Sequence, residues 1–460
     1  MAILRKSLFG LALLSCVATA TAVCADARIR APTPPMGWNS WDSYGLTIGE
    51  ADYRANAKVL TSLKEYGWRY AVVDMGWYMA NPDGKDRPLR DFQVDANGLL
   101  VPALSRFPSA AKGAGFKPLA DWVHRQDLKF GIHIMRGIPR AAVEKNMPIA
   151  GSGFHAADAA DTSDACGWDD GDWGVRDNAA GQAYYDSAIR LYAKWGVDFL
   201  KVDCIADHPY KPAEIRMIAA AIAKSGRPIL LSLSPGPTHL DHAAEISRYA
   251  QMWRISNDIW DSWHFPSDAT EDGYPAGVAT AFARLAKWSP YVGHGAWPDA
   301  DMLPFGSLRP HPGMGEPRQS RLTHEEQRTQ FSLWAISRSP LMLGTNLTEL
   351  DPFTRSLITN SRVIAVNQTA WESHPLANLP PGFDQAQVWT ARAGSRGKPA
   401  RYIAFFNRKD APAQLSATWK QLGFPGVHSA LDLWSGAKLP GTRRIEVTLP
   451  GHGSAVYEVK

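Results

Sequence analysis

The order of apolar and polar positions follows a regular alternation up to about residue 365. Apolar, β-rich runs predict strands at residues 36–41, 68–74, 129–135, 198–203, 228–234, 251–257, 291–296 and 340–344. Amphipathic stretches between them predict helices at residues 53–66, 181–195, 212–224, 276–288 and 325–337. Eight strands that alternate with helices indicate an α/β fold, a parallel sheet closed into a (β/α)8 TIM barrel. The rival, an open doubly wound sheet, usually shows a glycine-rich phosphate turn after its first strand, and the sequence has none there.

Several of the predicted strands end in a polar residue that a loop follows. Asp74, Asp203, Ser234 and Asn257 hold these positions. Because the carboxyl ends of all strands of such a barrel open on one face, we expect a site assembled there from the loops. The Gly-, Ala- and Asp-rich segment 139–176 is interpreted as a long functional loop, and segment 298–317 as a second one.

Beyond Asn367 the pattern changes to short alternating runs. Residues 371–384 are proline-rich and predict a linker, and strands are predicted at residues 387–391, 402–407, 415–419, 430–434, 444–449 and 455–459. Short strands at this spacing are typical of a small antiparallel sandwich. We therefore expect a catalytic barrel over residues 26–368 and a structural C-terminal β-sandwich domain over residues 369–460.

The first 25 residues have the pattern of an export signal. Arg5 and Lys6 precede an apolar run at residues 8–17, and a small-residue cleavage site ends at Ala25. The apolar run is too short to span a bilayer. We expect a signal peptide and a periplasmic or extracellular protein. The segment that ends at Cys16 loosely resembles a lipid-attachment site, which leaves a lipoprotein as the alternative.

Charge and aromatic content narrow the function only moderately. Hydrophobic residues make up 45% of the chain and charged residues 20%, as in an ordinary soluble globular protein. The formal net charge is +4, and +2 without Arg5 and Lys6 of the leader, too small to favour nucleic acid or an anionic membrane as partner. Eighteen tryptophans suit the apolar faces of sugar rings, although a large barrel also fills its core with tryptophan.

Removal of the leader leaves two cysteines, Cys166 and Cys204. In an exported protein they can form one disulfide, and a Cys166–Cys204 bridge would hold a loop over the candidate site. The alternative is a nucleophilic thiol at Cys204, beside Asp203, but no histidine stands in an obvious partner motif. The sequence leaves both states open.

Two acid-bearing segments carry the predicted chemistry. Lys201 and Asp203 lie on the same side of one strand, where a charge pair is costly to desolvate and adds little stability. Arg254 and Asp258 follow about one strand–helix–strand repeat later. Glycoside cleavage needs two carboxyl groups that flank the scissile bond. We therefore expect Asp203 as a nucleophile kept ionised by Lys201, which could also hydrogen-bond sugar hydroxyls. We expect Asp258 as the acid/base, with Arg254 either orienting it or holding a sugar 2-hydroxyl. Taken singly, each pair also fits a solvated strand end or a structural ion pair.

Further candidates are Asp74 with Trp77, and Asp299 with Asp301. A carboxylate beside an indole ring is a common sugar-binding arrangement, whereas Asp74 alone would also fit a helix cap or a turn. An Asp-x-Asp pair could bind a cation, but the remaining ligands of a calcium loop are absent from the sequence. We expect no metal and no cofactor, because acid/base and covalent catalysis need none.

Taken in chain order, these motifs resemble the melibiase family, glycoside hydrolase family 27, whose members are mostly α-galactosidases. The matching segments are residues 35–41, 73–77, 129–132, 195–203, 253–263, 297–303, 339–342, 357–360 and 363–368. The resemblance implies a (β/α)8 barrel followed by an antiparallel β-domain, with a retaining mechanism. It implies Asp203 as the nucleophile and Asp258 as the acid/base. The family's sugar-contacting positions fall on Trp41, Asp74, Lys201, Arg254 and Asp301.

The departures from the family concern the sugar and not the catalytic pair. The α-galactosidases usually carry a second Asp that reads the O4/O6 side of galactose, where this chain has Met75. His133 replaces the family's Tyr on strand three, and Ser234 replaces a Glu near the sugar 2-position. An apolar Met75 would suit a sugar without a 6-hydroxyl, and a small residue at position 234 is reminiscent of the α-N-acetylgalactosaminidases.

We therefore expect a secreted retaining exo-glycosidase that hydrolyses terminal α-D-galactosyl residues of oligo- or polysaccharides. The alternatives are the same mechanism on β-L-arabinopyranosides, N-acetyl-α-D-galactosaminides or isomaltose-type α-glucosides, and transglycosylation in place of hydrolysis. A rival from another class is a non-catalytic sugar-binding protein, which predicts the loss of Asp203 or Asp258, and both are present. A carbohydrate is the expected partner, with neither nucleic acid nor a membrane span.

Overall fold

The computed structural model describes residues 31–82, 92–269, 273–308, 316–394 and 400–460. The predicted signal peptide, residues 1–25, lies outside these ranges. In the part of the chain that is described, no helix is both long and apolar enough to cross a membrane.

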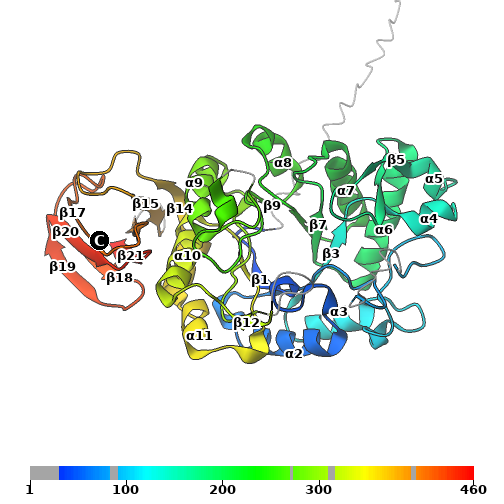
Figure 1. Cartoon of the computed structure of the whole chain (residues 1–460), viewed down its shortest axis with the longest axis horizontal. Helices are drawn as coiled ribbons and strands as arrows, with labels where there is room; N and C mark the ends of the chain where they lie inside the picture. Colours follow the sequence, from blue (N-terminus) through cyan, green and yellow to red (C-terminus); the bar gives the residue numbers. More distant parts are fainter. Residues whose placement is uncertain (1–30, 83–91, 270–272, 309–315, 395–399) are drawn as a thin grey trace, which may run out of the picture.

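The centre of the molecule is a parallel eight-stranded sheet in the order β10-β9-β8-β7-β3-β2-β1-β13 (Figure 1). Its strands are β1 (Met36–Asn39), β2 (Tyr70–Val73), β3 (Lys129–Met135), β7 (Phe199–Asp203), β8 (Leu230–Leu233), β9 (Met252–Arg254), β10 (Trp297–Asp299) and β13 (Leu341–Leu343). The two edges meet through Leu303, which follows β10 and whose backbone N–H donates to the carbonyl of Met342 at 2.8 Å. This closure confirms the predicted barrel.

Helices follow the barrel strands along the chain and surround the sheet. They are α1 (Trp41–Tyr44), α2 (Glu50–Thr61), α3 (Lys117–Arg125), α6 (Ala179–Trp195), α7 (Pro212–Ser225), α8 (Ala243–Tyr249), α9 (Val278–Trp288), α10 (His324–Ser337), α11 (Pro352–Ile358) and α12 (Ser361–Thr369). Local signals determine their ends: Asn178 caps α6, which stops at the left-handed Gly196, and Thr323 with Glu326 forms a capping box at α10.

One predicted strand lies in a different place. Residues 291–296 are apolar, but the strand at that point of the barrel is β10, which pairs with β9 in the register Asp299 to Arg254. The residues before it form a turn closed by hydrogen bonds between Gly293 and Ala296. Pairing with the neighbouring strand, and not local apolarity, therefore decides which residues enter the sheet.

The predicted long loop at residues 139–176 is a small folded insertion. It forms a three-stranded antiparallel sheet of β4 (Ile138–Pro139), β6 (Asp172–Val175) and β5 (Ala160–Ala165), with the short helices α4 (Arg140–Glu144) and α5 (Ala156–Ala159). The second predicted loop contains part of a two-stranded ribbon, β11 (Ser307–Leu308) and β12 (Arg318–Gln319). Both insertions rise from the carboxyl end of barrel strands.

The C-terminal part is an antiparallel β-sandwich, as predicted. A six-stranded sheet contains β14 (Trp371–Pro375), β15 (Ala386–Ala393), β16 (Ala400–Asn407), β21 (Ser454–Val459), β18 (His428–Asp432) and β19 (Lys438–Thr442), and β17 (Ala413–Thr418) pairs with β20 (Arg444–Leu449). The predicted linker at residues 371–384 is wrong in its first half, since β14 pairs with β15.

The sandwich packs against the barrel beside α10 (Figure 1). His452, in the turn between β20 and β21, lies 2.7 Å from Glu326 of α10 and 2.9 Å from Asp410 of its own domain. Its ring stacks on Trp263, with the ring centroids 4.1 Å apart. The contact connects the C-terminal domain to the loop that follows β9.

Candidate active site

Strand β7 shows how the sequence positions the first acid. Leu200 and Val202 point outward into the core under the helices, whereas Phe199 packs in the barrel interior against Tyr70. Because side chains alternate along a strand, Lys201 and Asp203 stand above Phe199 on the same inner side. The charged pair therefore lies where the interior opens at the carboxyl ends of the strands.

Asp203 is held in its ionised form by its surroundings. One oxygen accepts from the backbone N–H of Cys204 at 2.8 Å, and the other lies 3.4 Å from Nε2 of His133. Burial alone would raise the pKa of Asp203, but His133, the charge of Lys201 and the Cys204 N–H together lower it. About a fifth of the side chain, 21%, remains exposed, as a nucleophile requires.

Lys201 makes its direct ion pair with Asp74 and not with Asp203. Its Nζ lies 2.9 Å from Oδ2 of Asp74, which also accepts from Nδ2 of Asn39 at 2.6 Å. Asp74 is 1% exposed, and burial works against its charge, yet Lys201, His133 and the N–H of Met75 lower its pKa. Burial disfavours the charged form of Lys201, but the negative charges of Asp74 and Asp203 favour it and raise the pKa of Lys201. The positive charge of Lys201 therefore interacts with the negative charges of both Asp74 and Asp203.

The second acid lies beyond β9 in a network centred on Arg254. The guanidinium donates to Asp258 at 3.1 Å and lies 2.8 Å from Asp301, whose same oxygen accepts from the N–H of Ile259 at 2.7 Å. Burial, opposed by Arg254 and reinforced by Asp258 and Asp299, raises the pKa of Asp301 to about 7. Of the two carboxylates that contact Arg254, Asp258 is the more accessible to solvent: 31% of its side chain is exposed, against 4% for Asp301.

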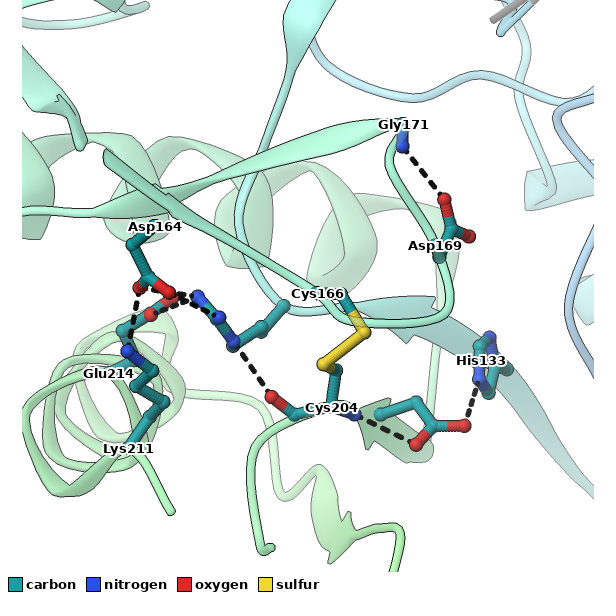
Figure 2. Close-up of a disulfide and its surroundings, with 10 residues drawn as sticks. His133, Asp164, Cys166, Asp169, Gly171, Cys204, Lys211 and Glu214 are labelled. Carbon is teal, nitrogen blue, oxygen red and sulfur yellow. Dashed lines mark hydrogen bonds and ion pairs between the residues drawn. A yellow bond between two sulfur atoms is a disulfide. The ribbon is translucent and has the colours of Figure 1, made fainter. Parts of the chain in front are cut away.

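Figure 2 shows the disulfide between Cys166 and Cys204, which confirms the bridged state. It joins the turn before β6 to the residue that directly follows Asp203, with the Cα atoms 6.0 Å apart. Met75 and Met135 pack against the two sulfur atoms. The bridge therefore holds the insertion beside the nucleophile and gives this wall of the site an apolar lining.

A buried arginine secures the same connection. Arg136 donates to the carbonyl of Cys204 at 2.7 Å and forms ion pairs with Asp164 at 2.8 Å and Glu214 at 2.9 Å. Asp164 belongs to the insertion and Glu214 to α7, so three segments meet at one guanidinium. Removal of one partner would leave a buried charge uncompensated.

The remaining predicted side chains differ in their access to the site. Trp41 is half-buried at the start of α1, and its backbone N–H donates to Oδ1 of Asn39. Ser234 is buried at the end of β8 and lines the same cleft as Lys201 and Arg254. Trp77 is fully buried, donates to the carbonyl of His133 and packs among core aromatic rings. The structure places Trp77 in the core beneath the site, not on the sugar-binding surface.

The structure adds residues that sequence reasoning did not assign. Asn39 contacts Asp74, and Asp42, fully buried on α1, has a pKa raised by burial and by the charges of Asp301 and Asp258. Tyr274 donates a hydrogen bond to Asp258. Asn39 lies inside the strand predicted at residues 36–41, within a matched motif, and was available as a signal. Tyr274 lies in a loop without any pattern.

The arrangement supports acid/base and nucleophilic chemistry on a polar, hydroxylated substrate. The cleft is lined by Lys201, which precedes Asp203 on β7, and by Arg254, which donates to Asp258. The two candidate acids themselves are not among the lining residues, but 21% and 31% of their side chains remain exposed. Within the described residues, no group of three or more His, Cys, Asp or Glu side chains is placed to hold a metal ion. Two carboxyl groups with fixed hydrogen-bond partners around a small cleft are the minimum that glycoside cleavage requires.

Comparisons with known proteins identify the relatives of this chain. Residues 169–369 match the family model of alpha galactosidase A, and residues 383–459 match the alpha galactosidase C-terminal beta sandwich domain. The alpha-galactosidase of Coffea arabica is 30% identical over 92% of this chain and 93% of its own length.

Two solved structures are more similar. The β-L-arabinopyranosidase of glycoside hydrolase family 27 from Geobacillus stearothermophilus, in complex with arabinose, is 42% identical, with a TM-score of 0.87 over 95% of this chain and 99% of that one. A putative alpha-N-acetylgalactosaminidase from Bacillus halodurans is 38% identical, with a TM-score of 0.80 over 94% of this chain and 98% of that one.

Proposed function

The chain belongs to the melibiase family, glycoside hydrolase family 27, and is a glycoside hydrolase; from this premise we propose that it is a retaining exo-glycosidase for terminal α-D-galactosyl residues. The proposal rests on two carboxylates at the same end of the barrel: Asp203, whose pKa is lowered, and Asp258, whose side chain is 31% exposed. The relatives named as α-galactosidases support the choice of sugar.

The first half of the reaction forms a covalent intermediate. Asp203 attacks the anomeric carbon, while Asp258 donates its proton to the leaving oxygen, so that the aglycone departs as an alcohol. Asp203 suits the attack because its environment lowers its pKa and leaves part of its carboxylate exposed. Arg254 holds Asp258 from the inner side of the site.

The second half returns the enzyme to its starting state. Asp258, now a carboxylate, takes a proton from water while the water oxygen bonds to the anomeric carbon. The bond between that carbon and Asp203 breaks, which releases the sugar and restores the Asp203 carboxylate and the protonated Asp258. The product keeps its anomeric configuration, because the carbon is inverted twice. Interception of the intermediate by a second sugar instead of water would give transglycosylation by the same steps.

Asp74 is the group that we assign to reading the axial 4-hydroxyl of the sugar. Lys201 and Asn39 fix its carboxylate in one orientation, so its remaining lone pairs have a defined direction. A pocket built on buried polar pairs rejects sugars that leave those pairs unmatched. This supports galacto-configured pyranosides as the substrate class.

One observation favours a second substrate, the β-L-arabinopyranoside, which is the galactoside without C6. Met75 follows Asp74 and packs with Met135 and the disulfide, so this wall is apolar where a second carboxylate would meet a 6-hydroxyl. The solved arabinopyranosidase is also the more similar relative, at 42% identity. Asp74 serves both sugars, and Met75 favours the smaller one.

Initial rates on p-nitrophenyl glycosides test the proposal. The panel comprises the α-D-galactoside, the β-L-arabinopyranoside, the N-acetyl-α-D-galactosaminide and the α-D-glucoside. We expect turnover of the first two and none of the glucoside, whose equatorial 4-hydroxyl misses Asp74. A dominant β-L-arabinopyranoside rate would select the second substrate, and a dominant glucoside or N-acetylgalactosaminide rate would contradict both. Polarimetry of the first-formed sugar tests retention.

We also propose that the protein is exported. The leader pattern at residues 1–25 supports this, and a disulfide is rare in the reducing cytosol. Fractionation of cells that produce the full chain, followed by mass determination of the mature N-terminus, tests it. A chain that begins at residue 1 in the cytosolic fraction would contradict export, and a lipid-modified Cys16 would select the lipoprotein.

A further inference from the structure

Tyr274 has an unusual place in the loop between Asp258 and α9. Its side chain is more than half exposed, at 55%, yet its hydroxyl donates a hydrogen bond to the Asp258 carboxylate. Burial of the phenol, with the charge of Asp258 and the hydrogen bond to it, raises the pKa of Tyr274. Tyr274 therefore remains a protonated donor over the whole range in which a glycosidase works.

The segment that carries Tyr274 is fastened to the backbone of the acid. Asn257 donates through Nδ2 to the carbonyl of Gly273 at 3.0 Å, and the N–H of Ala276 donates to the carbonyl of Asp258 at 2.9 Å. Gly273, directly before Tyr274, and Ala276, two residues after it, are thus bonded to residues 257 and 258. This double attachment fixes where the phenol stands relative to the carboxylate.

The two donors to Asp258 approach from opposite environments. Arg254 has 5% of its side chain exposed and belongs to the floor of the site, whereas Tyr274 is open to solvent. The leaving group of an exo-glycosidase departs toward solvent, so the phenol lies on the side of the acid from which the aglycone leaves. Tyr274 is therefore placed to orient Asp258 at the step in which its charge changes.

The charges around Asp258 explain why a neutral donor such as the Tyr274 hydroxyl is useful there. Arg254 is shared with Asp301, and Asp42 adds a further buried acid near Asp258. When Asp258 loses its proton to the leaving oxygen, a new negative charge appears beside these acids, and the shared arginine is only one cation. A hydrogen bond from a phenol stabilises that charge without adding a cation to the pocket.

We propose that Tyr274 is a positioning residue for the acid/base of the reaction. It holds the Asp258 carboxylate toward the glycosidic oxygen and stabilises the ionised form that appears after proton donation. The inference rests on the proposed role of Asp258.

Tyr274→Phe removes the hydroxyl and keeps the ring. One hydrogen bond to a charged group predicts about a tenfold fall in kcat/KM with a substrate of poor leaving group. A smaller fall is expected with an activated dinitrophenyl glycoside, which needs little protonation. The alkaline limb of the kcat/KM profile should move to higher pH, because the ionised carboxylate loses a donor. Equal losses on both substrates with an unmoved alkaline limb would overturn the proposal.

Tyr210→Phe is the matched control. Tyr210 also donates to a carboxylate, Glu245, at 3.0 Å, and its ring stacks on His242, but it makes no bond to Asp258. This variant should show the wild-type pH profile and the wild-type dependence on the leaving group. A shift of the same size in Tyr210→Phe would mean that the Tyr274→Phe result is not specific, and would count against the proposal.

Asp258→Ala separates failure of this inference from failure of the proposed function. If Asp258→Ala shows no dependence on the leaving group, the acid/base assignment is wrong and the role of Tyr274 falls with it. If Asp258→Ala shows the dependence and Tyr274→Phe behaves as wild type, only the Tyr274 proposal is overturned. In the double variant we expect no further loss from Tyr274→Phe, because the group that it orients is already gone.

Discussion

The ion pair between Lys201 and Asp74 offers the sharpest physical test of the site. The Asp74 side chain is buried, with 2% exposed, and the Lys201 side chain is largely shielded, with 14% exposed; their charged atoms are 2.9 Å apart. Lys201→Met removes the ammonium but keeps a chain of similar length, which leaves the Asp74 carboxylate with only the Asn39 amide and the Met75 N–H. Asp74→Asn removes the opposite charge. The two variants and their combination form a double-mutant cycle.

The expected change in the free energy of unfolding follows from the burial of the pair. Loss of one partner of a buried pair costs about 3–5 kcal/mol in the free energy of unfolding, because the other charge stays uncompensated. Loss of both removes two charges together, so we expect the double variant to be less destabilised than the sum of the single variants by about 2–3 kcal/mol. The pKa of Asp74 is lowered in the folded state, so the contribution of its charge is present at neutral pH and is lost as the pH falls through the folded value.

Urea unfolding at pH 7, followed by tryptophan fluorescence, measures the cycle. The control is Lys117→Met on α3, which breaks an equally short pair with Asp121 at 2.8 Å, but one whose side chains are 54% and 42% exposed. That control should cost less than about 1 kcal/mol. Additive single effects, or a Lys201→Met cost no larger than that of the control, would refute the reasoning.

Three further outcomes are expected. Asp203→Asn should lower turnover by roughly a thousandfold or more with an unchanged circular dichroism spectrum, and substantial residual turnover would exclude Asp203 as the nucleophile. Met75→Asp should raise the kcat/KM ratio of α-D-galactoside to β-L-arabinopyranoside by about tenfold, through one added hydrogen bond, and an unchanged ratio would mean that position 75 does not face C6. Asp301, whose pKa is raised to about 7, favours folding while protonated, so its contribution is present at low pH and is lost as the pH rises from about 4 to about 7. Asp301→Asn should flatten that part of the curve of melting temperature against pH, and an unaltered slope would contradict the assignment.

The barrel could be predicted because its signals are local and repeated. Strand β3 has the predicted bounds, and α6, α7 and α10 lie within two residues of theirs, since each combines an apolar face with a defined cap. The helices α3 and α8 were missed, although α3 has a strongly amphipathic pattern. The strand expected at residues 291–296 formed at Trp297–Asp299, because its register depends on β9, which a local pattern does not contain.

The sequence by itself determined the chemistry that the chain can perform and the side of each strand on which it stands. Lys201 and Asp203 share a face because strand geometry repeats every two residues, and this holds before any tertiary contact forms. The residue types at the strand ends were therefore sufficient to indicate two carboxylates, an adjacent lysine and an adjacent arginine.

Only the tertiary structure decided which of these groups meet. The strand order β7-β3-β2 brings Lys201 to Asp74, 127 positions earlier in the chain, and so makes the lysine a partner of the proposed sugar-reading acid. The same packing turns Trp77 inward, joins Cys166 to Cys204 and sets Tyr274 beside Asp258. The physical reason is that contacts between distant segments depend on how the strands close and how loops fold over them, and local propensity carries no information about either.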